Sequence, residues 1–493
     1  MKNKINALLP TISFAFLASL LLLTFLGTIP GLHEDEAWVG VSANDILHGS
    51  RTIIGISNYT GPMLIYIVAL LFKFFGYKII ILRLFTAFSL IICSFLYYFV
   101  IKRLFDKSLA VLSTLILVSL PFFTTSGRIA LEQFALNPLL ALLSIFLLLT
   151  GSNKGFCIKF LFLFFSGICL GIGTWNHVIF FTLPITLFIV AIVFYGKKIF
   201  SSAINYSVIF GFIVALLPRI LLYSPPNFSQ FYEGVLQRIR EWPALLFRIA
   251  HGDILFQRYS GEVIMPSANI VFCLFALGLV MMLKKYFCRK TVKNEIQTIL
   301  FTFILFAATI VICPGNSDRY FLLILFTIPI FAAFPFFEFL QRPSIKKITV
   351  FAFCAFICFQ LIRTYVNYFA SQIQSHGKTS SFQLGSMPET SNHFIDTQKL
   401  YLQLINYNAK YVSAESFIAM PLQFYNVQQK RIPFVSDINY NPIFSKEENG
   451  EPTFLVFYSG GLRKAEVGQY PQCERVSEDD HFVIIKCASK SLL

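Results

Sequence analysis

Long runs of apolar residues, nearly free of charge, recur along this chain of 493 residues and constrain its fold more than any other feature. About 20 apolar residues in a helix cross the hydrocarbon core of a bilayer, and inside lipid a helix satisfies all its own backbone hydrogen bonds. Charged residues make up 13% of the chain, against about 25% in soluble domains. The sequence therefore predicts an all-α polytopic membrane protein with about eleven transmembrane helices, at residues 7–29, 79–101, 108–124, 134–150, 157–175, 178–196, 202–222, 267–284, 296–313, 320–340 and 347–366.

The first apolar run follows a positively charged start, a pattern that a secretory signal also shows. We interpret it as a retained helix, because it is long enough to span and many further spans follow.

Lysine and arginine alternate from loop to loop in a way that predicts the orientation. If the N-terminus is cytoplasmic, every loop rich in these cations is cytoplasmic too, as the positive-inside rule requires. Cations in cytoplasmic loops thus explain the net charge of +15. No basic cluster with interleaved aromatic residues suggests nucleic-acid binding. These cations are expected on the cytoplasmic side of the membrane: Lys102, Arg103, Lys107, Lys154, Lys159, Lys197, Lys198, Lys284, Lys285, Arg289, Lys290, Lys293, Arg342, Lys346 and Lys347.

Residues 61–76 form a shorter apolar run that contains Lys73. Treating it as a span would reverse the side of every later loop, so we predict a helix lying along the membrane interface. Residues 1–366 then form the transmembrane domain, with long extracytoplasmic loops at 30–78 and 223–266.

Residues 367–493 are more polar and are expected to form a small extracytoplasmic domain, either α/β or mostly β. Alternating stretches such as "PTFLVFYSGG" and "HFVIIKCAS" indicate strands. Cys473 and Cys487 flank a strand, a polar turn and a strand, so they could face each other across a hairpin. An extracytoplasmic compartment permits a disulfide, and two unpaired buried thiols are the alternative.

The first outer loop carries the densest group of charges, in "HEDEAW", where His33, Glu34, Asp35 and Glu36 follow an uncharged apolar run. The simpler interpretation is a solvated acidic loop. The other is a catalytic site, because a carboxylate can take a proton from an incoming hydroxyl group.

Further polar residues fall on the same side of the membrane. Arg128 and Arg319 each lie just beyond a helix end, where snorkelling to lipid headgroups is common, yet arginine also offers a planar fork for phosphate oxygens. His177 is more often a hydrogen-bonded interfacial residue than a ligand, and Tyr320 can belong to the aromatic belt.

Together, these stretches resemble a known family. A first helix is followed by "DEAWVGVSANDILHG", "GPMLIYIVALLFKFFG", "SGRIALEQFALNPLLALLSIFLLL" and a late "DRYFLLILFTIP". This order is similar to that of the polytopic GT-C glycosyltransferases, in particular the bacterial dolichyl-phosphate-mannose-protein mannosyltransferase-like and lipid A aminoarabinose transferase-like enzymes. The resemblance covers roughly residues 5–340, and it implies a protein of a bacterial inner membrane.

The resemblance implies transfer of a sugar from a polyprenyl-phosphate donor to an envelope acceptor, with inversion at the anomeric carbon. The family's acidic pair falls on Asp35 and Glu36, with Asp35 as the acid/base residue. Its other site positions fall on Arg128, Glu132, Arg319 and Tyr320, while His177 occupies a loop where relatives often have lysine. The residues make no cofactor certain, and Mg²⁺ or Mn²⁺ shared by Glu36 and Glu132 is possible.

Two other classes of function are open. A transporter or flippase of lipid-linked sugars would place polar residues near the bilayer midplane and often shows repeated halves, whereas these spans are nearly free of charge in the middle and show no repeat. An inactive envelope scaffold would assemble in the membrane without transferring sugar.

Overall fold

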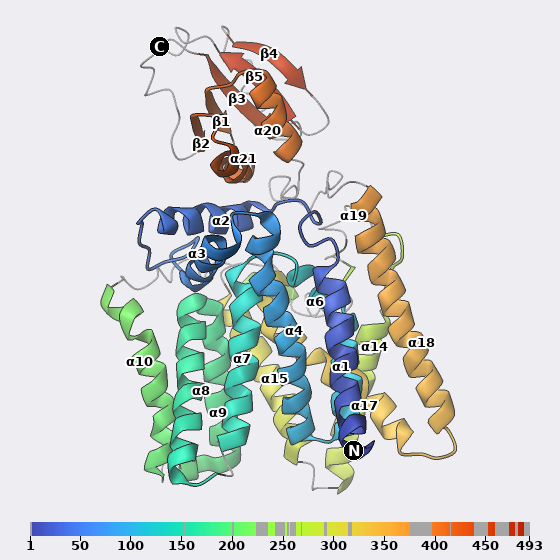
Figure 1. Cartoon of the computed structure of the whole chain (residues 1–493). Coiled ribbons are helices and arrows are strands. Elements are labelled where there is room, and N and C mark those ends of the chain that lie inside the picture. Colours follow the sequence, from blue (N-terminus) through green and yellow to red (C-terminus); the bar gives the residue numbers. More distant parts are fainter. Residues whose placement is uncertain are drawn as a thin grey trace.

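The computed structural model describes residues 2–151, 154–199, 202–222, 235–241, 252–253, 256, 263–267, 269–289, 293–313, 318–374, 397–414, 416–437, 452–458, 473–478 and 482–487. The predicted outer loop 223–266 therefore lies largely outside the described residues. A helical bundle carries a smaller α/β domain at the end opposite the N-terminus (Figure 1).

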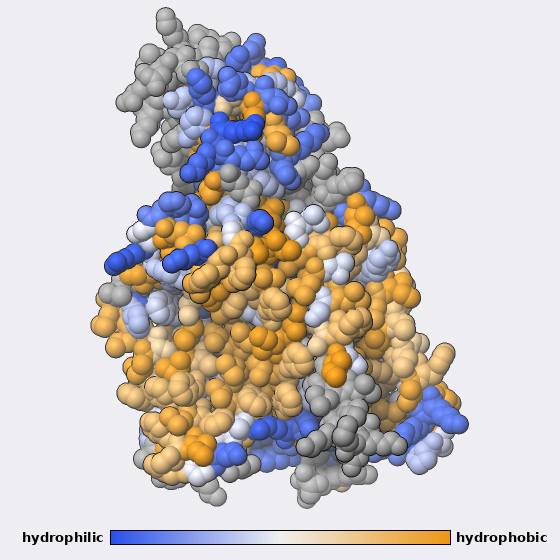
Figure 2. Space-filling view, in the orientation of Figure 1, coloured by the Kyte–Doolittle hydropathy of each residue, from blue (hydrophilic) through white to orange (hydrophobic). Residues whose placement is uncertain are grey.

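Within the described residues, eight helices are long and apolar enough to cross a membrane. The face shown in Figure 2 has a wide apolar belt between two hydrophilic ends. The remaining predicted spans coincide with shorter apolar helices at Ile12–Leu23, Lys107–Ser119 and Tyr206–Leu221. The helices of the bundle are α1 (Lys2–Leu23), α4 (Ile79–Leu104), α5 (Lys107–Ser119), α6 (Pro121–Ser126), α7 (Glu132–Gly151), α8 (Phe156–Asn176), α9 (Thr182–Tyr195), α10 (Tyr206–Leu222), α14 (Ile270–Arg289), α15 (Lys293–Ile312), α16 (Leu322–Leu325), α17 (Ile328–Leu340) and α18 (Lys346–Thr364).

Two helices of the segment predicted to be the first outer loop, α2 (Glu34–Leu47) and α3 (Met63–Phe75), lie across the end of the bundle instead of through it (Figure 1). The predicted interfacial helix at 61–76 is therefore present as α3. Short 3₁₀ helices connect or extend other elements: η1 (Val178–Phe181), η2 (Gly196–Ile199), η3 (Ala203–Asn205) and η4 (Asp318–Phe321).

Several helix ends differ from the predicted spans. α1 ends at Leu23 instead of near residue 29, and Phe25 then adopts a left-handed backbone (φ 55°) that turns the chain. The run at 108–124 breaks before Pro121, because proline lacks the amide that would continue the helix. The last span continues through the π-helix η5 (Tyr365–Ala370) and α19 (Ser371–Gln374), beyond the boundary expected at residue 366.

Close backbone contact joins α8 to α10. A side chain at Gly167 would place its Cβ 2.0 Å from the carbonyl oxygen of Val208, and one at Gly211 would lie 2.2 Å from that of Phe164. Small residues that let helix backbones approach are the usual means of association in lipid, where the hydrophobic effect does not drive helices together.

The C-terminal domain contains a five-stranded mixed sheet in the order β2-β1-β3-β5-β4. β1 (Tyr411–Ala414) is parallel to β2 (Phe434–Asp437) and β3 (Thr453–Tyr458), and β5 (Phe482–Cys487) is antiparallel to β3 and β4 (Cys473–Glu478). Two helices, α20 (Thr397–Asn406) and α21 (Ser416–Gln429), complete it, and α21 lies between the sheet and α2 (Figure 1). The domain is thus α/β, one of the two predicted classes.

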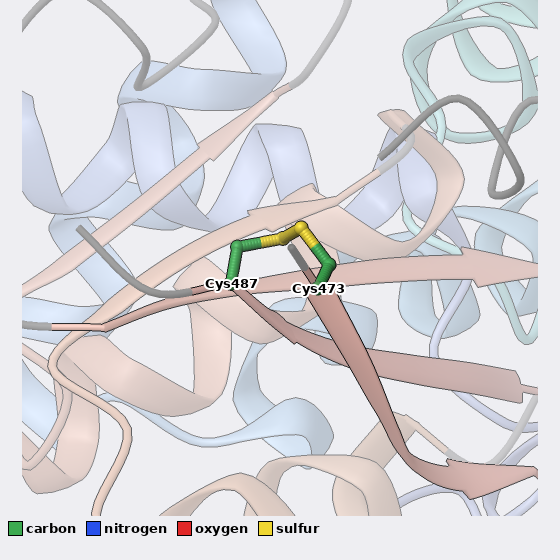
Figure 3. Close-up of a disulfide and its surroundings, with 2 residues drawn as sticks. All are labelled: Cys473 and Cys487. Carbon is green, nitrogen blue, oxygen red and sulfur yellow. A yellow bond between two sulfur atoms is a disulfide. The ribbon is translucent and has the colours of Figure 1, made fainter. Parts of the chain in front are cut away.

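The two cysteines of this domain stand directly opposite each other on β4 and β5. A disulfide joins them, with their Cα atoms 4.2 Å apart (Figure 3). This is the pairing expected from the hairpin pattern in the sequence.

Candidate functional site

α2 begins immediately after His33, which caps the helix. Nδ1 of His33 accepts a hydrogen bond from the Asp35 amide at 3.0 Å, and the Glu36 carboxylate accepts one from the His33 amide at 2.9 Å. Successive residues of a helix are about 100° apart around its axis, so the two adjacent carboxylates point in different directions. The side chain of Asp35 is 24% exposed, whereas that of Glu36 is fully buried.

Glu36 forms a buried ion pair with Arg83, near the start of α4. Nε of Arg83 donates to Oε2 of Glu36 at 3.0 Å, Nη2 donates to Oε1, and the Ala130 amide also donates to Oε2, at 3.2 Å. We expected Glu36 to contact substrate or a metal ion. Its two oxygens are instead hydrogen-bonded inside the protein, so Glu36 organises the site without facing the cavity described below.

The remaining donors of Arg83 hold the turn between α1 and α2. Nη1 donates to the carbonyls of Leu26 at 3.1 Å and Pro30 at 2.9 Å, and Nη2 donates to that of Gly31 at 2.9 Å. A single buried guanidinium therefore connects the end of the first helix to the first turn of the second.

Arg128 is also fully buried and binds the end of α1 and the turn that follows it. Its guanidinium donates to the carbonyls of Leu21 (2.9 Å), Leu22 (3.1 Å) and Ile29 (2.9 Å). The last carbonyls of a helix have no partner within it, and Arg128 supplies partners at the end of α1. Burial lowers the pKa of Arg128, and the phenol of Tyr368 acts in the opposite direction. The phosphate contact expected of Arg128 is thus replaced by a structural one in this conformation.

Four of the sequence-predicted site residues meet at one small polar cavity of about 40 Å³. Asp35 reaches it from α2, Glu132 from the start of α7, His177 from the end of α8, and Tyr320 from η4. One water molecule needs about 10–15 Å³, so the cavity has room for a few waters but not for a sugar ring. The remaining lining residues are Ile56, Ser57, Tyr59, Thr60, Leu131 and Gln133.

One wall of the cavity is the loop before α3, which pairs with the end of α8. Thr60 forms an antiparallel bridge with His177, and the Gly61 amide donates to the Asn176 carbonyl at 2.8 Å. A Cβ at Gly61 would lie 2.6 Å from the carbonyl oxygen of Trp175, so this approach requires glycine.

Arg219, in the last turn of α10, holds the same loop from the other side. Its guanidinium donates to the carbonyls of Thr60 (3.2 Å), Trp175 (3.4 Å) and Asn58. The wall is therefore anchored by a helix that lies far away in the sequence.

His177 presents one ring nitrogen to the backbone. Its Nδ1 accepts a hydrogen bond from the Ile179 amide at 3.2 Å, which in the neutral ring leaves the hydrogen on Nε2. The ring contacts those of Tyr59 and Tyr320, with centroids 5.5 Å and 5.7 Å away. His177 is thus a hydrogen-bond donor at Nε2, held in place by two tyrosines.

Asn176 places Glu132 relative to α8. Its side-chain amide donates to the Glu132 carbonyl and to Oδ1 of Asn137, both at 3.0 Å. The start of α7 and the end of α8 are therefore joined at the cavity.

Tyr320 lies in η4 and is almost completely buried. Arg319 precedes it in the same short helix, but the Arg319 side chain lies outside the described part of the structure.

The sequence interpretation missed two anchoring residues, Arg83 and Arg219. Each is an arginine inside a predicted span, at 79–101 and 202–222. Ionisable residues in membrane segments are rare and mark functional or organising positions, so their location was the available signal.

A metal shared by Glu36 and Glu132 was one possible interpretation of the sequence. Among the described residues, no three His, Cys, Asp or Glu side chains gather closely enough to hold an ion. Since Glu36 faces Arg83, the carboxylates left at the cavity are Asp35 and Glu132, which could hold a divalent ion only with substrate oxygens as further ligands.

Residues 59–222, from the loop before α3 to the end of α10, match the family model described as dolichyl-phosphate-mannose-protein mannosyltransferase. No curated protein matches the chain by sequence.

Solved structures share the fold of the whole chain. ArnT from Cupriavidus metallidurans bound to undecaprenyl phosphate aligns over 99% of both chains with a TM-score of 0.62 and 11% identity. The oligosaccharyltransferase AglB from Archaeoglobus fulgidus, in complex with an inhibitory peptide and a dolichol-phosphate, aligns over 98% of this chain and 74% of its own, with a TM-score of 0.55 and 12% identity. These comparisons confirm the predicted resemblance in fold, and the match at residues 59–222 agrees with the predicted resemblance to glycosyltransferases that use lipid-linked sugars.

Proposed function

We propose that this protein transfers a sugar from a polyprenyl-phosphate donor to an envelope lipid, glycan or protein, with Asp35 as the general base. The observation that carries the proposal is the cavity at which Asp35, Glu132, His177 and Tyr320 meet, although they come from four separate segments. The polyprenyl phosphates bound to ArnT and AglB support this class of donor.

The cavity is proposed to face the extracytoplasmic side. The N-terminus lies at the opposite end of the bundle, together with the cation-rich ends of α4, α14 and the start of α18 (Figure 1). The positive-inside rule places that end in the cytoplasm, and the C-terminal domain is then outside.

The chemistry is a single displacement with inversion. An acceptor hydroxyl oxygen forms a bond to the anomeric carbon while the bond from that carbon to the donor phosphate oxygen breaks. Asp35 takes the hydroxyl proton, and the polyprenyl phosphate leaves with the bonding electrons. Since phosphate is a competent leaving group, no strong general acid is needed, but hydrogen-bond donors at the phosphate lower the barrier.

Arg128 is engaged with backbone carbonyls, so the phosphate contacts are assigned to other groups. We propose Nε2 of His177, the hydroxyl of Tyr320 and the guanidinium of Arg319, which is adjacent to Tyr320 in η4. Glu132 would orient the acceptor, or hold a divalent ion together with Asp35.

The test uses the purified protein in nanodiscs with a panel of radiolabelled polyprenyl-phosphate sugars and an envelope extract as acceptor. Mass spectrometry identifies the glycosylated product, and NMR of the intact glycoside gives its anomeric configuration. We expect a product whose configuration is opposite to that of the donor, and a product that retains it would contradict the single displacement.

A vesicle assay addresses the transporter alternative. If the lipid-linked sugar moves across the bilayer and no sugar is transferred to an acceptor, the protein is a transporter and the proposed function is wrong.

A further inference from the structure

The C-terminal domain packs directly on the helix that carries Asp35. Its helix α21 lies along α2, and the ring of Phe424 rests on Gly40. A Cβ at Gly40 would come within 2.5 Å of this ring and 3.5 Å of Leu82, so the contact depends on glycine.

Phe424 also reaches the rest of the outer loop. Its ring centroid is 4.5 Å from that of Tyr77, which in turn lies 4.5 Å from the ring of Phe72 on α3. Phe424 is completely buried. One residue of the C-terminal domain therefore packs on α2, and through Tyr77 on α3.

α2, on which Phe424 packs, is also held by the buried ion pair, because Glu36 in its first turn is bound to Arg83 of α4. The contact at Gly40 lies four residues after Glu36 in the same helix. α21 therefore packs on the helix that this ion pair anchors.

We infer that the C-terminal domain is a positioning element of the transfer site, in which Phe424, seated on Gly40, holds α2 and with it Asp35. This inference rests on the proposed function of Asp35. Phe424 does not touch the cavity and acts only through the helix. A small displacement of a reacting group can lower the rate by about 10²-fold, so loosening α2 should lower kcat more than it raises KM.

The experiment compares Phe424→Ala, Gly40→Ala and the double variant of the full-length protein in nanodiscs. Hydrogen exchange of peptides from residues 34–47 reports the order of α2, and sugar transfer reports kcat and KM. Gly40→Ala leaves every residue of the C-terminal domain unchanged, so it tests the contact from the side of α2. Phe457→Ala, on the opposite face of the sheet, is the control for general loss of domain stability.

We expect each single change to speed exchange in α2 and to lower kcat by about 10- to 100-fold, with Phe457→Ala doing neither. In the double variant the ring is absent, so the alanine at position 40 no longer collides and should restore part of the protection that Phe424→Ala removes.

Wild-type exchange in α2 of Phe424→Ala, or purely additive effects in the double variant, would overturn the inference. A kcat lowered equally by Phe457→Ala would overturn it too. A wild-type protein that transfers no sugar would contradict the proposed function, while the exchange measurement would still decide whether Phe424 orders α2.

Discussion

Glu36 and Arg83 form an ion pair, completely removed from solvent, that joins the first turn of α2 to α4. Its neighbour Asp35 points instead to the small cavity shared with His177 and Tyr320. Two adjacent carboxylates of one acidic motif therefore have different environments, and substitutions should separate their roles.

Replacing Asp35 by Asn removes a base while keeping the shape of the side chain. We expect transfer to fall by about 10²–10⁴-fold, the usual contribution of a general base, with thermal stability unchanged. The measurement is initial rate at equal amounts of folded protein in nanodiscs, with Glu34→Gln as the neighbouring control. Transfer at the wild-type rate would show that the base is elsewhere, and His33 and Glu132 would be tested next.

Glu36→Gln and Arg83→Met should each act on stability. Removing one member of a buried ion pair leaves an uncompensated charge or unpaired donors and costs about 3–5 kcal/mol. We expect a lower Tm in detergent for each variant. The fall in Tm of the double variant should be smaller than the sum of the two single falls. Arg51→Met, at an exposed arginine of the same outer loop, should leave the Tm within error. Additive losses would mean that the two residues act independently.

Arg128→Met tests whether this arginine holds the end of α1 or binds phosphate. Because its guanidinium donates to three backbone carbonyls, we expect a lower Tm with an unchanged KM for the donor. His177→Phe, which removes the Nε2 donor, should raise that KM instead. A normal Tm with a raised donor KM in Arg128→Met would restore the phosphate-binding interpretation.

The disulfide between Cys473 and Cys487 closes a loop with a sequence separation of 14. In the chain-entropy account, a disulfide that closes a loop of about 15 residues stabilises the folded state by about 3 kcal/mol. Replacing both cysteines by Ser should therefore speed exchange of β3 and β5 relative to a Cys288→Ser control. Thiol labelling of the unfolded, unreduced protein checks the pairing, and two reactive thiols in this domain would reject it.

The orientation predicts opposite accessibility of two parts of the chain. Alkaline phosphatase fused after residue 380 should be active outside the cytoplasm, and Cys288, exposed at the other end of the bundle, should react only with reagents that reach the cytoplasm. An inactive fusion would show that the orientation is the reverse of the one proposed.

Much of the architecture could be predicted because hydrophobicity and charge act locally. The apolar runs located the bundle helices, the run interrupted by Lys73 was correctly kept out of the bundle as α3, and the alternating stretches of the tail became β3 and β5. Helix ends were less accurate, since the end of α1 depends on Arg128, which follows about a hundred residues later.

The sequence by itself determined that this protein is a polytopic helical bundle with an α/β tail, and it singled out the outer segments whose residues meet at the cavity. Only the tertiary structure decided which polar residues face that cavity. Four of them line it: Asp35, Glu132, His177 and Tyr320. Glu36 is instead bound to Arg83, and Arg128 to backbone carbonyls, in buried contacts. The physical reason is that a charge buried in a membrane protein must find partners, and these partners are distant in the chain, so the role of each charge depends on packing that no local pattern encodes.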